Sequence, residues 1–209
     1  MRRVLLALGV LALSAGWLGP LPALARGAFF GHMALHMGVV AVAAPLLACG
    51  LSGTRLDPVA RAPRVFAPLL ACLLDFFAVW SWHLPQLHHA ARHTAAGLVA
   101  EQASFFLASL FLWLSCVGGN RGDAGRAGAG VLALLLTFMH MMLLGVLLSL
   151  AQRVLYPHAG TPAVLSPLGD QHLGGAVMIV GGLPYLLAGV WLTAGLVRHR
   201  VLDAAERGP

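Results

Sequence analysis

Two histidines and two methionines near the start of a long apolar segment have a spacing that could bind a metal ion. His32, Met33, His36 and Met37 repeat a His-Met dipeptide at an interval of four residues. Positions four apart lie on one face of a helix, so the two histidines form one stacked pair and the two methionines another beside it. Imidazole and thioether groups together suit copper, particularly Cu(I). Core packing is the alternative interpretation, because methionine commonly fills gaps between helices.

The composition of the chain places this motif in a membrane protein. The 209 residues are 59% hydrophobic and only 10% charged, whereas an ordinary soluble domain has about 25% charged residues. All basic residues are arginines, which occur singly or in small groups at the ends of apolar segments. Although the net charge is +6, this distribution fits membrane orientation better than nucleic-acid binding. We therefore predict an all-α, polytopic membrane helix bundle that binds lipid and no nucleic acid.

Six apolar segments approach the roughly 20 residues that a helix needs to cross a bilayer. They cover approximately residues 4–18, 29–51, 65–83, 95–117, 128–152 and 173–197, with most of the prolines between them. We expect residues 26–200 to form the membrane bundle and residues 201–209 a cytoplasmic tail.

Residues 1–25 are either a first transmembrane helix or a cleavable signal peptide. Arg2 and Arg3, an apolar stretch and then Ala23-Leu24-Ala25 follow the layout of a secretory signal. The retained helix is the alternative that we favour.

Arginine positions predict the orientation. Ten of the thirteen arginines lie at the two termini and in the connections after the second and fourth segments. The positive-inside rule then places both termini in the cytoplasm if the first helix is retained, with a bacterial inner (cytoplasmic) membrane as the location. Of the ten histidines, only His199 falls on the cytoplasmic side. This asymmetry indicates a metal or proton site that faces outward.

Three ionisable residues fall inside the other apolar segments. Asp75 lies near the middle of the third segment, Glu101 about two turns into the fourth, and His140 within the fifth. Ionisable groups inside a bilayer are costly and usually face a partner. His140 is the candidate to complete a site opposite His32 and His36, whereas Asp75 could pair with an arginine or a histidine that the sequence does not identify.

The predicted copper ligands are therefore His32, His36 and His140, with a thioether added by Met37 or Met178. Asp170 and Glu101 are predicted to support these ligands as hydrogen-bond acceptors or proton-coupled carboxylates. Asp170 could equally cap the last helix, because aspartate accepts hydrogen bonds from free N–H groups at a helix start. Copper binding requires neutral imidazole, so we expect the affinity to fall below about pH 6.

A second group of histidines lies in the connection between the third and fourth segments. His88, His89 and His93 follow His83 within a short stretch that begins at Pro85. Such a cluster could pick up a metal ion transiently or could be only a solvated loop, and the solvated loop is the alternative that we favour.

The order of several short motifs resembles a known family. The motifs are His32-Met33-Ala34-Leu35-His36-Met37, Ala44-Pro45-Leu46-Leu47, Trp82-His83-Leu84-Pro85, His140-Met141-Met142-Leu143-Leu144-Gly145, Leu155-Tyr156-Pro157 and Ser166-Pro167-Leu168-Gly169-Asp170-Gln171-His172-Leu173-Gly174-Gly175. In this order, across about residues 29–197, the chain resembles the caa3-type cytochrome c oxidase assembly factor (CtaG) family. The resemblance implies a non-enzymatic role in maturing a haem–copper oxidase by delivering copper. Its implied partners are the subunits of that cytochrome oxidase and a periplasmic copper donor.

Two departures from the family pattern affect the expected site. The family has a Glu-His pair where this chain has Glu101-Gln102, and two Gln after the aspartate where this chain has Gln171-His172. If the missing histidine is a ligand in the family, this chain either lacks that ligand or replaces it with His172.

Two other functions remain as alternatives. Facing histidines of the second and fifth segments could hold a b-type haem in an electron-transfer protein. A proton-coupled metal transporter could use His140, Glu101 and Asp75 as a relay.

Overall fold

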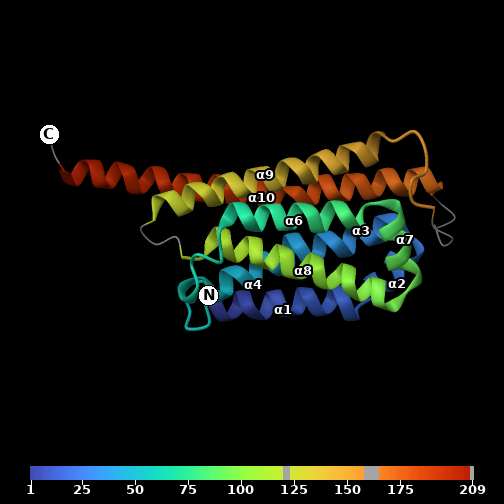
Figure 1. Ribbon diagram of the computed structural model, residues 1–209, viewed down its shortest axis with the longest axis horizontal. Coiled ribbons are helices and arrows are strands. Elements are labelled where there is room, and N and C mark those ends of the chain that lie inside the picture. The colour runs from blue at the N-terminus through green and yellow to red at the C-terminus, as the bar shows by residue number, and fades with distance from the viewer. Residues whose placement is uncertain (120–122, 158–164, 208–209) are drawn as a thin grey trace.

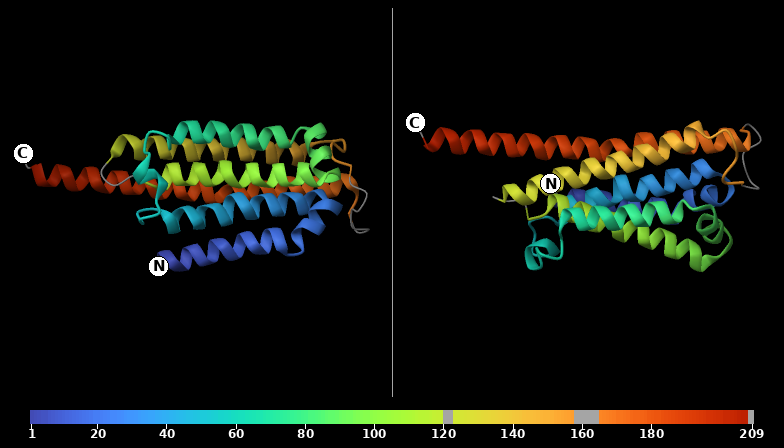
Figure 2. Two further views of the ribbon diagram at one scale, coloured as in Figure 1. Left: turned by 60° about the horizontal axis from the view of Figure 1, so that its bottom comes forward. Right: turned by 45° about the horizontal axis from the view of Figure 1, so that its top comes forward.

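The computed structural model describes residues 1–119, 123–157 and 165–207, and within these ranges every regular element is a helix. The predicted all-α class is therefore confirmed. The helices run roughly parallel to one another in a bundle, and α10 extends beyond the others (Figures 1 and 2). The elements are α1 (Arg2–Leu18), α2 (Leu21–Gly27), α3 (Phe29–Met37), the π-helix η1 (Gly38–Ala43), α4 (Ala44–Leu51), α5 (Pro58–Arg61), α6 (Pro68–Trp82), α7 (Pro85–His93), α8 (Ala95–Val117), α9 (Ala124–Leu150) and α10 (Pro167–Arg207).

Four helical stretches of the described chain are long and apolar enough to cross a membrane on their own. They are Phe29–Leu51, Ala95–Val117, Ala124–Leu150 and Pro167–Arg198. Two more spans result if each bent pair counts as one: α1 with α2, bent by 44°, and α6 with α7, bent by 74°. The protein is thus a multi-pass membrane protein, and the expected number of about six helices agrees with the upper count.

The ends of the helices separate into two groups. The start of α1 and the end of α10 lie at one end of the bundle, while α2, α7 and the start of α3 lie at the other (Figure 1). α10 continues to Arg207, so the predicted tail is largely an extension of the last helix; residues 208–209 lie outside the described residues. The end that carries α2, α3 and α7 is called the site end below.

The stretch that was expected to be a solvated loop is the helix α7. Pro85 occupies the first helical turn, where its missing N–H costs nothing and its fixed φ favours the helix. His88 on this helix is buried, whereas His89 and His93 are exposed. The loop prediction was therefore wrong for the structure of this stretch and for the burial of His88.

A π-helical turn interrupts the span Phe29–Leu51 directly after Met37. Within it, the carbonyl of Val40 accepts hydrogen bonds from Ser109 Oγ at 2.9 Å, Trp113 Nε1 at 3.0 Å and the Tyr185 hydroxyl at 3.1 Å. A π turn leaves backbone groups outside the regular α-helical ladder. Side chains of α8 and α10 use this carbonyl and so fix the middle of the span.

Glycines let α10 approach α3 closely on one side. A Cβ atom at Gly174 would lie 2.5 Å from the Phe29 ring, and one at Gly181 would lie 2.3 Å from Met37 Sδ. Distances this short leave no room for a side chain at either position. The Phe29 and Met37 side chains of α3 therefore pack against α10.

Candidate metal centre

The start of α3 is held by a carboxylate from another helix. The backbone N–H groups of Phe29 and Phe30 donate to the two carboxylate oxygens of Asp170 at 2.8 and 2.9 Å. Asp170 lies in the first turn of α10 but does not serve there as the predicted cap, because Ser166 Oγ accepts from Gly169 N–H at 3.0 Å. Asp170 instead caps α3 and so fixes the backbone that carries the first histidine.

Replacing Asp170 by alanine is expected to lower the stability of the purified protein by about 1–2 kcal/mol, the usual cost of losing a helix cap. Thermal unfolding in detergent would measure the loss. Asp170→Asn keeps one acceptor and should lose less, and Gln86→Ala at an exposed position of α7 should lose least. An Asp170→Ala protein as stable as the wild type would contradict the capping role.

His32 is the centre of a buried cluster of imidazoles at the site end. Its ring lies 6.3 Å from that of His36, 5.6 Å from that of His83 and 4.8 Å from that of His88, measured between centroids. The rings of His32 and His36 are nearly parallel, at 8°, as expected for positions four apart on a helix. His32 and His36 come from α3, His83 from the bend after α6, and His88 from α7. Residues far apart in the sequence thus meet in one place.

Three members of this region bring possible ligand atoms together. His32, His88 and Glu101 each offer one atom, and these atoms lie within 4.8 Å of one another. All three residues are buried, and they belong to α3, α7 and α8. Atoms that share one tetrahedral ion at about 2.0 Å are about 3.3 Å apart. The three residues therefore fit a metal ion after a closing movement of about 1.5 Å or less.

Glu101 already has a cationic partner. Arg92, four residues after His88 on α7, donates from Nη2 to Glu101 Oε2, and His32 Nδ1 lies 3.8 Å from the same oxygen. Gln102 Nε2 also donates to Glu101 Oε2, at 3.2 Å. In turn, Trp17 Nε1 donates to Gln102 Oε1 at 3.2 Å. Gln102 thus connects α1 to the carboxylate.

His36 is buried without a hydrogen-bond partner for either ring nitrogen among the described residues. Its ring packs against Phe105 at a centroid distance of 4.0 Å. A buried polar group that forms no hydrogen bond costs about 1–3 kcal/mol. The His36 imidazole therefore destabilises the fold. A side chain with this effect is typical of a residue selected for binding rather than for stability.

His36→Leu is therefore expected to stabilise the metal-free protein by about 1–3 kcal/mol, because an apolar side chain of similar size replaces an unsatisfied one. Thermal unfolding of metal-free protein in detergent is the measurement. His172→Leu is the matched control and should destabilise, since it removes a hydrogen bond. A loss of stability in His36→Leu would contradict the argument.

His83 has a fixed tautomer. Its Nδ1 lies 2.6 Å from the carbonyl oxygen of Val79, which can only accept, so Nδ1 carries the proton. The lone pair is therefore on Nε2, and this atom has no hydrogen-bond partner among the described residues. Metal-binding histidines are commonly oriented in this way by a backbone carbonyl.

Tyr156 covers the same bend from the connection between α9 and α10. Its hydroxyl donates to the carbonyl of His83 at 2.5 Å, and its ring stacks on Phe29 at 4.4 Å. Burial raises the pKa of Tyr156 to about 12, so the hydroxyl remains a donor at neutral pH.

His140, the third predicted imidazole ligand, pairs with a carboxylate. His140 Nε2 lies 3.6 Å from Asp75 Oδ2, and its ring contacts Phe76 edge-on at 5.3 Å. This contact identifies a partner for Asp75 that the sequence left open. His140 thus contacts α6, while it remains close enough to His36 to interact with it electrostatically.

The two predicted thioether ligands belong to the interface between α3 and α10. Met37 packs against Gly181, and Met178 is fully buried on α10. Positions 174, 178 and 181 lie on one helical face, so Met178 lies on the face of α10 that contacts α3. Both methionines thus contribute to the packing of α3 against α10.

His172 contacts the end of α9. Its Nε2 lies 2.8 Å from the carbonyl of Ala151, the C-cap residue of that helix. The neighbouring Gln171 accepts from Leu155 N–H at 2.7 Å and donates to the Arg153 carbonyl at 3.3 Å. Both side chains therefore organise the connection between α9 and α10.

Sequence reasoning missed His83 and His88 as members of the site. His83 lies in the Trp82-His83-Leu84-Pro85 motif, two residues before the proline that begins α7, and a proline at this place is a signal for a bend. The burial of His88 has no such signal, because it depends on Phe29 and Tyr156, whose rings contact it at 5.6 and 4.8 Å.

The fold and the site together define a class of protein. It is a polytopic membrane protein whose helices enclose a polar site, which consists of buried imidazoles and a paired carboxylate at one end of the bundle. The model of the cytochrome c oxidase caa3 assembly factor family matches residues 1–199, nearly the whole chain. The chain belongs to this family of assembly factors, as the order of its motifs indicates. Membership implies interaction with components of the oxidase and suggests a non-catalytic role. No curated protein and no solved structure matches the chain.

Proposed function

We propose that this caa3 oxidase assembly factor binds copper at the site end and passes it to a haem–copper oxidase. The observation that carries the proposal is the convergence of His32, His88 and Glu101 within 4.8 Å in the interior of the bundle. Imidazole is a good ligand for copper, and a carboxylate adds a hard donor for a divalent ion. His36 and His83 lie next to this group and supply further imidazoles.

The proposed ligand set differs from the sequence-based set. His32 belongs to both, and Glu101 changes from a supporting carboxylate to a ligand. His140, Met37 and Met178 stay predictions that the geometry supports less, because their contacts are with α6 or across the interface of α3 and α10. Asp170 acts on the site through the backbone of α3.

The proposed location is the bacterial inner membrane, with the site end toward the periplasm. The support is the excess of arginines at the other end of the bundle, to which the start of α1 and the end of α10 also belong. In this orientation the site faces a periplasmic copper donor, and the protein acts as a metallochaperone rather than as an enzyme.

Complementation of a bacterial host that lacks this protein would test the function. We expect wild type and Gln86→Ala to restore copper to the oxidase, and His32→Ala and His83→Ala to fail although they are present in the membrane. Gln86 is exposed on α7 and serves as the control. Full oxidase copper with both histidine variants would refute the proposed role.

Haem is the second candidate, favoured only by the near-parallel rings of His32 and His36. The Phe105 ring, 4.0 Å from that of His36, occupies the space beside the pair and so disfavours a large macrocycle. A Soret band in the purified protein would favour haem, and copper without such a band would favour the present proposal.

A further inference from the structure

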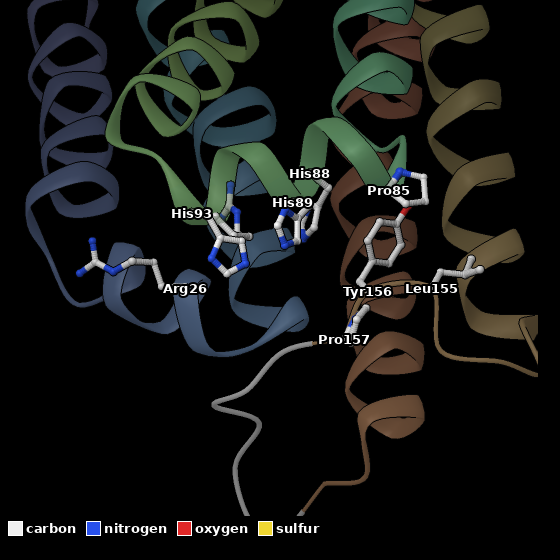
Figure 3. A pocket seen from close by; sticks show the side chains of 9 residues that line it. Arg26, Pro85, His88, His89, His93, Leu155, Tyr156 and Pro157 are labelled. Atoms are coloured by element: carbon white, nitrogen blue, oxygen red, sulfur yellow. The ribbon is translucent and has the colours of Figure 1, made fainter.

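A pocket opens at the site end next to the buried cluster. It has a volume of about 300 Å³ and is lined by residues of α2, α7 and the connection between α9 and α10 (Figure 3). His88 and Arg92 form part of its wall, and both are also members of the buried region around Glu101. The pocket therefore leads from the surface to the proposed ligands.

Two exposed histidines stand at this pocket. His89 and His93 are four residues apart on α7, and their ring centroids are 4.0 Å apart. Both belong to the lining of the pocket, and Figure 3 shows them close together beside His88. Imidazoles at positions i and i+4 of a helix can share one metal ion, because they lie on one face.

The two histidine-bearing faces of α7 have different surroundings. His88 and Arg92 form an inward pair, whereas His89 and His93, one position later, form an outward pair. The His88 ring is 4.8 Å from the His32 ring. One short helix thus carries an exposed imidazole pair and a buried imidazole that belongs to the internal group.

We propose that His89 and His93 form an entry site that captures a copper ion at the surface and passes it through His88 to the internal site. This inference rests on the proposed copper function. Only ligand exchange is involved: a bond from the ion to an exposed imidazole breaks as one to His88 forms, and the oxidation state does not change. An ion held at the pair is presented to His88 at a high effective concentration.

Copper uptake by the purified full-length protein in detergent tests the proposal. Metal-free protein is mixed with a limiting amount of Cu(II) held by a coloured chelator, and the decay of the coloured chelate is followed in time. The His89→Ala/His93→Ala variant is expected to load about tenfold more slowly than wild type, with the same final copper content. Gln86→Ala, another exposed change on α7, should load like the wild type.

The possible outcomes test the proposed copper function and the entry site separately. Wild-type protein that binds no copper overturns the proposed function and the entry site together. An unchanged loading rate in the double variant overturns the entry site alone, as does a lower final copper content, which would make the pair part of the storage site. Slower loading in Arg26→Gln with normal loading in the histidine variant would identify the pocket as an anion site and also overturn the proposal.

Labelling of the wild-type protein provides a measurement that needs no variant. Diethyl pyrocarbonate modifies exposed imidazoles, and mass spectrometry locates the modification. Copper added just before the reagent should protect His89 and His93, and protection should decrease as the ion moves inward. Equal labelling of both residues with and without copper would overturn the entry site.

Discussion

His32→Ala is expected to lower the copper affinity of the purified protein by at least about 100-fold. Substitution of a group that merely orients a metal ligand already costs about 10–100-fold in affinity, and His32 is the member that contacts every other part of the cluster. It lies next to His36, His83 and His88, and its Nδ1 is 3.8 Å from Glu101. Competition with a chromogenic Cu(II) chelator would measure the affinity.

Met37→Leu is the control that separates the two ligand sets. Leucine preserves the volume of methionine, so the contact with Gly181 and the position of α3 are retained, but the sulfur is lost. We expect the affinity to stay within a factor of about two, because the Met37 thioether packs against Gly181 of α10 and is not one of the proposed ligands. A large loss of copper affinity in Met37→Leu would favour the sequence-based His/Met site instead.

Glu101→Gln is expected to destabilise the metal-free protein by about 3–5 kcal/mol, because it leaves the charge of Arg92 without its partner in the bundle interior. Both side chains are almost completely buried. Arg92→Gln should cost a similar amount for the converse reason. Thermal unfolding in detergent, or titration with a denaturing detergent, would measure both losses.

The double variant Glu101→Gln/Arg92→Gln completes the cycle and should recover most of the lost stability, since it removes both charges. Arg26→Gln at the same end changes an exposed guanidinium and should have little effect. Strictly additive losses in the double variant would show that the two side chains do not depend on each other. Arg92→Gln should also bind copper more tightly, because it frees one oxygen of Glu101.

The spans Phe29–Leu51 and Ala95–Val117 could be predicted from the sequence. The thickness of the bilayer sets the length of a spanning helix, and an apolar run of that length is visible in the hydropathy of the chain. The helix α7 could not be predicted, because its polar residues and Pro85 are typical of both a loop and a short interfacial helix. Its 74° bend from α6 buries His88, and only the neighbouring helices determine such a bend.

The relative orientation of side chains was partly predictable. Adjacent positions on an α-helix point about 100° apart, so the prediction that His36 and Met37 bind one ion required side chains from two different faces of the helix to converge. The pairing of His140 with Asp75 could not be foreseen, because it requires knowing that α9 faces α6 at this depth. The role of Asp170 likewise depends on the meeting of α10 with the start of α3, 140 residues away in the chain.

The π turn at Gly38–Ala43 has a consequence for how the long second span responds to mutation. One extra residue in a helix offsets the faces before and after it by about 100°. Contacts with α10 fix the rotation of the half with His32 about the helix axis. In the other half, Gly50 packs against Leu6 of α1 and fixes the rotation there. The span therefore behaves as two helical segments whose rotations about the axis are set separately. Deleting the exposed Val42 would convert the two segments into one continuous α-helix. The first half would then rotate relative to the second, and the histidines would leave their cluster although none of them had been changed.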